Sequence, residues 1–116
     1  MRFATLKKRR DFLKVRDGGK YQARRSFVVQ YLSHSDKGPV EIRVGFTATK
    51  RIGNAVIRNR CKRRLRALIR NHLDKIKQFN RSIDLVLIAR YTTPDIDYAV
   101  MEKEFLDCLD KIFGKT

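Results

Sequence analysis

Apolar and polar positions along the chain follow two different periods, which predicts both strands and helices. Residues 26–33 are rich in β-branched and aromatic side chains, and residues 40–49 alternate between apolar and polar positions. The apolar side of this alternation carries Val40, Ile42, Val44 and Phe46. Residues 82–90 are apolar almost throughout, as expected of a buried central strand. We expect a shorter strand at 20–25 and a turn at 35–39.

Helical spacing predicts three helices. The first is expected over 6–16, capped by Thr5 and ended by the glycine pair 18–19. The second follows a cap at Asn54 and ends near 73–76. The third is capped by Asp97, and its apolar side carries Tyr98, Met101, Phe105, Cys108, Leu109 and Ile112.

These elements follow one another in the order α, β, β, β, α, β, α. We therefore predict an α+β fold in which three helices pack on one small, mixed, four-stranded sheet. The chain has 116 residues, enough for one domain with a modest core. It contains no internal repeat and no low-complexity linker, so residues 1–116 are treated as a single domain.

The second predicted helix has an apolar stripe beside a strongly basic surface. On a helical wheel the stripe consists of Ile57, Cys61, Leu65, Leu68, Ile69 and His72. Along one edge of the stripe lie Arg58, Lys62, Arg66 and Arg70. The outward arc holds Arg60, Arg63 and Arg64.

The charge of this helix is of one sign, because residues 53–70 contain seven basic side chains and no acidic one. Like charges four residues apart cost roughly 0.2–0.5 kcal/mol per pair. A solvated surface usually mixes signs, so this pattern favours a phosphate-bearing partner over a merely hydrated basic face. Six of the seven are arginine, whose planar guanidinium suits phosphates and stacks on bases.

The whole chain is strongly basic, with 28 Lys and Arg against 12 Asp and Glu and a formal net charge of +16. Its hydrophobic content of 42% is too high for a disordered basic tail. The charge is also segregated, because residues 95–116 are net acidic. A segregated basic surface on a folded domain indicates a nucleic-acid partner.

The sequence also argues against several other classes of protein. The longest apolar run, 83–89, is far too short to span a membrane. The basic N-terminus lacks the apolar core of a signal peptide, so we expect a cytoplasmic protein. Cys61 and Cys108 have no metal-ligand spacing, and both fall on apolar helical faces, where we expect them to be packing residues.

The stretch "KRIGNAVIRNRCKRRLRALIR" (50–70) resembles the signature of the bacterial ribonuclease P protein subunit, with its Arg-Asn-Arg core at 58–60. The resemblance covers nearly the whole chain. "LKKRRDFLKVRDGG" resembles the first helix of that family, and "SFVVQYL", "RVGFTATK" and "DLVLIAR" resemble its strands. The family also implies a left-handed crossover between two adjacent parallel strands, where the general rule favours a right-handed one.

The resemblance implies an accessory role in a ribonucleoprotein endoribonuclease. A catalytic RNA, with Mg²⁺ bound mainly by that RNA, removes the 5′ leader of precursor tRNA, and no side chain of the protein is catalytic or ligates metal. The protein binds this RNA and the single-stranded leader, and requires neither a membrane nor a protein partner. The RNA-binding residues implied are Lys50, Arg51, Arg58, Asn59, Arg60, Lys62, Arg63, Arg66 and Arg70. Which of them meet the catalytic RNA and which the leader is left open.

The family is also expected to bind the leader in a cleft between the sheet and a helix. The residues matched to this cleft are Phe12, Arg16, Tyr31, Thr47 and Thr49. Aromatic rings stack on unpaired bases, and hydroxyl groups add hydrogen bonds without demanding one base. Arg16 departs from the family, which often has a second aromatic there. For Phe12 and Tyr31, ordinary core packing is the alternative.

Two other kinds of function compete with this interpretation. A protein-only nuclease would need an acid or base such as His34 or His72, and Asp11, Glu41 or Asp84 to hold Mg²⁺, but no spacing groups these residues. A ribosomal or other structural RNA-binding protein would share the basic surface without the Arg-Asn-Arg motif. A DNA-binding module has no helix-turn-helix or zinc spacing in its favour.

Overall fold

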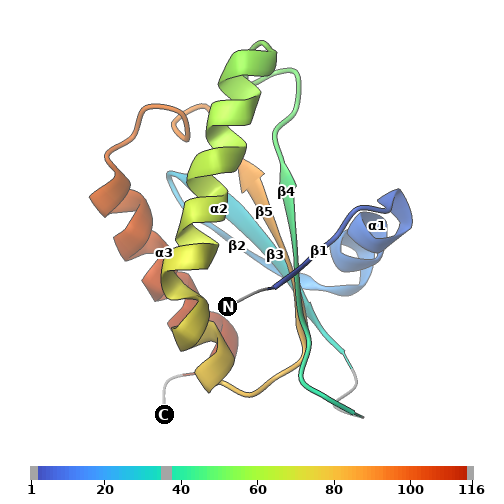
Figure 1. Cartoon of the computed structure of the whole chain (residues 1–116). Helices are drawn as coiled ribbons and strands as arrows, with labels where there is room; N and C mark the ends of the chain where they lie inside the picture. The colour runs from blue at the N-terminus through green and yellow to red at the C-terminus, as the bar shows by residue number, and fades with distance from the viewer. Residues whose placement is uncertain (1–2, 35–37, 115–116) are drawn as a thin grey trace.

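The computed structural model describes residues 3–34 and 38–114, which form one sheet with helices on both faces (Figure 1). The predicted turn at 35–39 lies partly outside the described residues. The elements are β1 (Ala4–Thr5), α1 (Arg9–Gly18), β2 (Lys20–Ala23), β3 (Phe27–Ser33), β4 (Ile42–Thr47), α2 (Ala55–Gln78), β5 (Ile83–Ala89) and α3 (Tyr98–Phe113).

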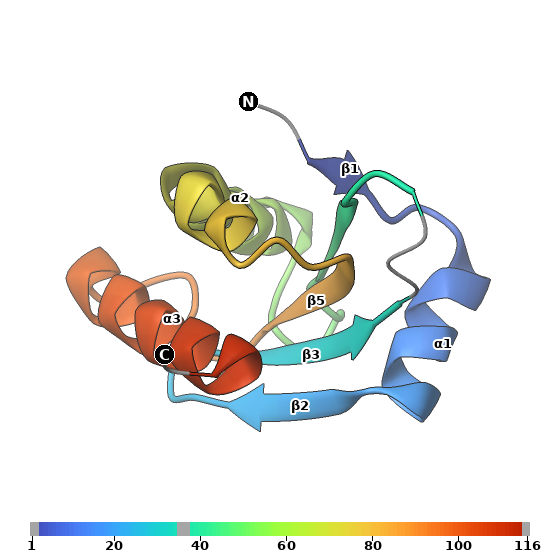
Figure 2. The ribbon, with the colours of Figure 1, turned by 90° about the horizontal axis from the view of Figure 1, so that it is seen from below.

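The sheet has five described strands in the order β1-β4-β5-β3-β2. β5 is central, parallel to β4 and antiparallel to β3, and all but one of its residues are buried, as its apolar sequence predicts. Helices α2 and α3 cover one face of the sheet and α1 lies on the other (Figure 2). The predicted α+β class is therefore confirmed.

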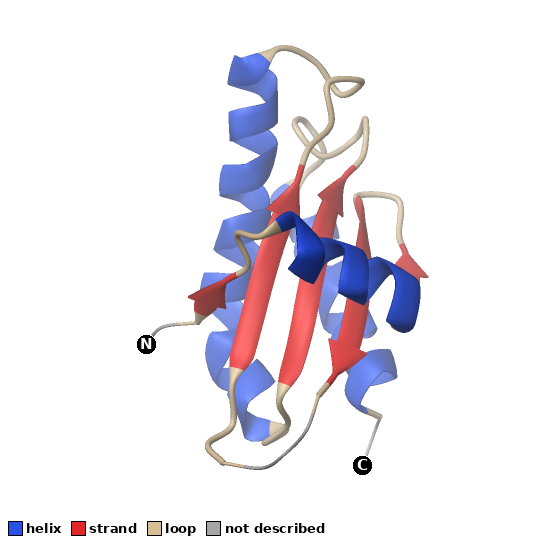
Figure 3. Cartoon of the chain, turned by 90° about the vertical axis from the view of Figure 1, so that its right-hand side faces the viewer, coloured by secondary structure: helices blue, strands red, loops and turns tan. Residues whose placement is uncertain are grey.

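The connection from β4 through α2 to β5 is left-handed. Figure 3 views the sheet from the side of α1, with β4 to the left of β5, both strands pointing upward and α2 behind them. Seen from the side of α2, the chain therefore moves leftward as it crosses from β4 to β5. The rare hand that the family resemblance implies is confirmed.

The larger core lies between the sheet and the helices α2 and α3. From α2 it receives the six buried side chains Cys61, Leu65, Leu68, Ile69, Leu73 and Ile76. A smaller cluster on the other face consists of Leu6, Val15 and Val86, with Phe12, Leu32 and Ile88 packed against it. Cys61 and Cys108 are both buried in the larger core, as expected for packing residues.

The start of the chain differs from the prediction, because the fifth strand, β1, replaces the expected first turn of helix. Thr5 lies in β1 opposite Val44 and does not cap a helix. Leu6 continues this pairing by donating its backbone N–H to the carbonyl of Val44 at 2.9 Å. Helix α1 therefore begins at Arg9, after Lys8, which makes no side-chain capping bond. Backbone pairing with β4 outcompetes the local capping signal.

Two other helix starts match their predicted caps. The side chain of Asn54 accepts a hydrogen bond of 3.0 Å from the backbone N–H of Ile57, and that of Asp97 accepts one of 3.0 Å from Ala99. The strand predicted over 40–49 is shorter in the structure, since β4 spans Ile42–Thr47 and Val40, before it, is 43% exposed.

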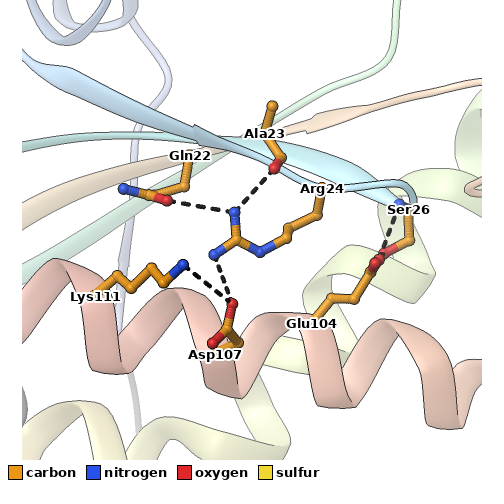
Figure 4. Close-up of polar contacts among 7 residues, drawn as sticks. All are labelled: Gln22, Ala23, Arg24, Ser26, Glu104, Asp107 and Lys111. Carbon is orange, nitrogen blue, oxygen red and sulfur yellow. Dashed lines mark hydrogen bonds and ion pairs between the residues drawn. The ribbon is translucent and has the colours of Figure 1, made fainter.

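Helix α3 is held to the turn between β2 and β3 by polar contacts (Figure 4). Arg24 donates to Asp107 at 2.8 Å, and Glu104 accepts from the backbone N–H and the hydroxyl of Ser26 at 3.1 and 2.6 Å. Lys111 lies 4.0 Å from Asp107. Glu104 and Asp107 of α3 thus have their hydrogen-bond partners within the protein.

Candidate nucleic-acid interface

Helix α2 presents its cations on the sides that do not pack on the sheet. Arg63 and Arg70 are exposed, and Arg58, Lys62 and Arg66 are half-buried. Among the described residues none of these five forms an ion pair with a carboxylate. These five side chains, which we call the α2 basic face, are therefore available to an anionic partner.

Two arginines predicted to point outward are engaged with the loop 91–97 instead. Arg60 donates from Nε to the carbonyl of Pro94 at 2.7 Å. Arg64 donates to the carbonyls of Thr93, at 2.6 Å, and of Ile96. The outward position predicted for Arg64 is wrong, because its partner carbonyls are about thirty residues away in sequence and give no local signal. Arg60 is exposed and keeps further N–H donors, so its contact with RNA stays a prediction.

The guanidinium of Arg66 lies over the ring of Phe46, 5.1 Å from its centroid. Phe46 in turn meets Phe3 edge to face, with the ring centroids 6.3 Å apart. The ring attracts the weakly hydrated guanidinium electrostatically, which favours this orientation of Arg66. Arg66 is thereby positioned beside the C-terminal end of β4.

A small hollow of about 190 Å³ lies where β4 leads into α2. It is lined by Ala48, Ala55, Arg58, Asn59 and Lys62. Nε of Arg58 is buried there without a hydrogen-bond partner. Two cations and an amide around a hollow of this size suit one phosphate group. Lys50 and Arg51 are exposed in the preceding turn.

The α1 side of the sheet brings together two of the residues matched to the leader cleft. The ring of Phe12 lies against Gly45, where an added Cβ would stand 2.5 Å from a ring atom. Thr47, two residues along the same strand, faces the same side and lies in register with Ile88. Both Phe12 and Thr47 are half-buried, so each keeps surface that a ligand can reach.

The other matched residues lie at the margins of this surface or away from it. Arg16 is exposed on α1 and pairs with Asp17 at 2.9 Å. Thr49 is exposed just beyond β4, where its backbone carbonyl accepts from the N–H of Ile52 at 3.0 Å. Neither side chain is placed against Phe12 by the contacts described.

Tyr31 lies on the opposite face of the sheet, so its expected place beside Phe12 is wrong. It is in register with the buried Leu85 and packs against the larger core. Its neighbour Gln30 is the residue of β3 that faces α1. Period-two alternation gives a sequence signal for this, because Phe27 and Val29 share the buried face with Tyr31.

Three of the residues considered for a protein-only nuclease, Asp84, His34 and His72, make contacts within the protein. Arg43 donates to both carboxylate oxygens of the buried Asp84, at 2.8 and 2.7 Å, and these bonds raise the pKa of Arg43 above its ordinary value. His34 lies 3.2 Å from Asp84, which already neutralises Arg43. His72 is elsewhere, on the seam between α2 and α3, 3.0 Å from Glu102.

The described residues contain no group of three or more His, Cys, Asp and Glu side chains arranged to hold a metal ion. Asp11, Glu41 and Asp84 are therefore not brought together as Mg²⁺ ligands. Over the described part of the chain, no helix combines the length and the apolar character needed to cross a membrane.

Comparisons with known proteins agree with this geometry. The model of the family Ribonuclease P matches residues 1–113. The chain belongs to the ribonuclease P protein family. A ribonuclease P protein component of Gluconacetobacter diazotrophicus is 43% identical over 96 residues, covering 83% of this chain and 79% of the relative. One from Bacillus velezensis is 38% identical over 111 residues, covering 96% and 87%.

Solved ribonuclease P proteins have the same fold. The Staphylococcus aureus protein superposes with a TM-score of 0.74 at 28% identity, over 97% of each chain. The Thermotoga maritima protein gives 0.73 at 26% identity, over 92% of this chain and 96% of the other. This chain is accordingly the protein component of a ribonucleoprotein endoribonuclease, and an RNA subunit is its partner.

Proposed function

We propose that the chain binds the catalytic RNA of ribonuclease P through the α2 basic face and the single-stranded 5′ leader of precursor tRNA on the α1 side of the sheet. It thereby assists the Mg²⁺-dependent endonucleolytic removal of the leader, in the cytoplasm, and gives the mature 5′ end. The observation that carries this proposal is the α2 basic face itself, five cations that pair with no carboxylate of the described chain.

The arrangement of α2 supports phosphate binding in particular. The hollow beside Arg58 and Lys62 offers several N–H donors to one phosphate, and Arg66 is oriented by Phe46. Each phosphate that such groups neutralise releases condensed counterions, which is the main driving force for RNA binding at low salt.

The α1 side of the sheet supports contact with an unpaired strand. Phe12 offers part of an aromatic ring, and Thr47 a hydroxyl, beside the half-buried apolar surface of Val28 and Ile88. Stacking of a base on an aromatic ring is worth roughly 1–3 kcal/mol and tolerates any base.

Mg²⁺ would be bound mainly by RNA phosphates in this proposal, and the RNA would supply the catalytic groups. The protein contributes fixed positive charge, which reduces the repulsion between the phosphates of substrate and catalytic RNA. The concentration of Mg²⁺ needed for cleavage should therefore fall when the protein is present.

The test is reconstitution with the catalytic RNA of a related bacterium, measuring precursor cleavage as a function of Mg²⁺ with and without the chain. We expect tighter precursor binding and a lower Mg²⁺ requirement with the chain, and no cleavage by the chain alone. Cleavage by the protein alone would support the nuclease alternative. No change in either quantity would reject the proposal.

A structural RNA-binding protein of the ribosome is the main alternative use of the α2 basic face. Purification of the chain from cells under gentle conditions distinguishes the two. A single RNA of a few hundred nucleotides supports the proposal, whereas recovery of ribosomal subunits supports the alternative.

A further inference from the structure

Tyr21 is a large aromatic residue left in solvent at one edge of the sheet. It lies in the edge strand β2 and is 69% exposed. Its two strand neighbours point the other way. Gln22 is turned toward Arg24 beside α3 in Figure 4, and Lys20 shares its register position with Tyr31 of the larger core. Tyr21 therefore faces the side of the sheet on which α1 lies.

A single row of residues joins Tyr21 to Phe12 across this side. Tyr21 is in register with Gln30, Gln30 with Val86, and Val86 with Gly45, against which the Phe12 ring lies. Neighbouring strands are about 4.8 Å apart, so the two ends of the row are about 14 Å apart at the backbone. Val86 itself is buried under α1 with Val15, so RNA cannot follow this row. A strand of RNA that meets both rings would cross along the neighbouring row on the same face, whose residues are half-buried or exposed: Thr47, Ile88, Val28 and Ala23.

The surroundings of Tyr21 suit an unpaired base. The next position on the same face of β2 is Ala23, which is small and exposed, so the flank of the tyrosine ring on that side is not crowded by a large neighbour. Gln30, directly opposite, is half-buried, and its amide carries both donors and acceptors for the edge of a base. An aromatic face next to an amide is the combination that single-strand RNA-binding domains use.

We propose that Tyr21 and Gln30 form a second base-binding position for the precursor leader, with Tyr21 stacking on the base and Gln30 bonding to its edge. β4, next to Phe12, leads directly into α2, whereas β2 is the opposite edge of the sheet. The catalytic RNA, which carries out cleavage, is proposed to bind α2. Tyr21, on the strand farther from α2, therefore takes a leader nucleotide farther from the cleavage site than the one at Phe12. This inference rests on the proposed function, since it requires the leader to lie on the α1 side.

The test uses holoenzyme reconstituted with catalytic RNA and precursor tRNAs whose leaders are lengthened one nucleotide at a time. For the unmodified protein we expect affinity to rise at an early nucleotide, through Phe12, and again at a later one. Tyr21→Ala should remove the later rise, about fivefold to a hundredfold in affinity, the range for one stacked base. Tyr21→Phe should keep it, and Gln30→Ala should weaken the base preference at that nucleotide.

Gln22→Ala, on the other face of the same strand, is the matched control and should keep both rises. Circular dichroism of each variant confirms that the sheet is intact. If the unmodified protein shows no gain with leader length at all, the proposed leader function fails. If it shows the later gain and Tyr21→Ala keeps that gain in full, the leader function stands and the second position is rejected.

Discussion

At Gly45 the absence of a side chain determines where the ring of Phe12 can lie. A Cβ there would stand 2.5 Å from one ring atom and 3.3 Å from the side chain of Leu6. Phe12 is thereby partly packed and partly exposed, so packing and ligand binding are not exclusive roles for it.

Replacing Phe12 by alanine separates these two roles. If the exposed part of the ring stacks on a leader base, Phe12→Ala weakens binding of precursor tRNA by roughly 1–3 kcal/mol and leaves the affinity for mature tRNA unchanged. The measurement is the ratio of the two dissociation constants, with Leu13→Ala on the same helix as the control. An equal loss for both RNAs would assign Phe12 to packing alone.

Cys108 provides a prediction about pH. Burial raises the pKa of its thiol from an ordinary value of 9.0 to about 11. The folded state holds this proton more tightly than the unfolded state does, so the contribution to stability is complete below pH 9 and is lost as the pH rises toward 11. The loss is up to about 3 kcal/mol.

Urea denaturation between pH 8 and pH 11 measures this loss. Cys108→Ala should be less stable below pH 9 because it leaves a cavity, but its stability should fall less steeply above pH 9 than that of the unmodified protein. Equal slopes would show that the thiol does not titrate differently in the two states.

At the scale of elements, α2 combines structural and RNA-binding arginines on one helix. Arg64 binds the carbonyls of Thr93 and Ile96, whereas its neighbour Arg63 is exposed and makes no ion pair within the described chain. The local sequence does not distinguish Arg63 from Arg64, because the difference depends on a loop some thirty residues farther along the chain.

Arg63 and Arg64 give a test in which one variant should lose stability and the other should lose RNA affinity. Arg64→Met should lower the free energy of unfolding by roughly 1.5–3 kcal/mol, since the carbonyls of Thr93 and Ile96 lose a charged donor. Arg63→Met should change it by less than about 0.5 kcal/mol but weaken RNA binding. Urea denaturation and RNA titration are run on both. Similar stabilities for the two variants would contradict the structural role of Arg64.

The α2 basic face gives a quantitative prediction for RNA binding. Replacing Arg58, Lys62 or Arg66 singly by alanine should weaken affinity for the catalytic RNA and lower the slope of log affinity against log salt by up to about one unit per lost phosphate contact. Lys103→Ala, on the outer side of α3, is the control. An unchanged slope in all three variants would show that these residues do not contact RNA phosphates.

An element can be predicted from the sequence when the interactions that form it lie within a few residues of one another. The stripe of α2 and the caps Asn54 and Asp97 act within one or two turns, and all are confirmed. β1 has only two residues and no period of its own, and it exists because Val44 offers a partner strand. The face on which Tyr31 lies is predictable from its alternation with Phe27 and Val29, whereas its residue type alone points to the wrong face.

Across the whole molecule the two signs of charge are sorted by face. Carboxylates of α3 meet cations of the surrounding elements, as in Asp107 with Arg24 and, at 3.7 Å, Asp110 with Lys75. The α2 basic face is left without such partners among the described residues. Part of the net charge of +16 is therefore left unbalanced on the α2 basic face.

This sorting predicts how the free protein responds to salt. Repulsion among the unbalanced cations acts over about 10 Å at 0.1 M salt and about 3 Å at 1 M, so added salt screens it. The free energy of unfolding should rise between 0.05 and 0.5 M sodium chloride, although salt weakens the α3 ion pairs, because exposed pairs contribute little. Urea denaturation over that range measures the rise. Arg63→Gln and Arg70→Gln together should reduce it, whereas stability that falls with salt would mean that the α3 ion pairs outweigh the repulsion on α2.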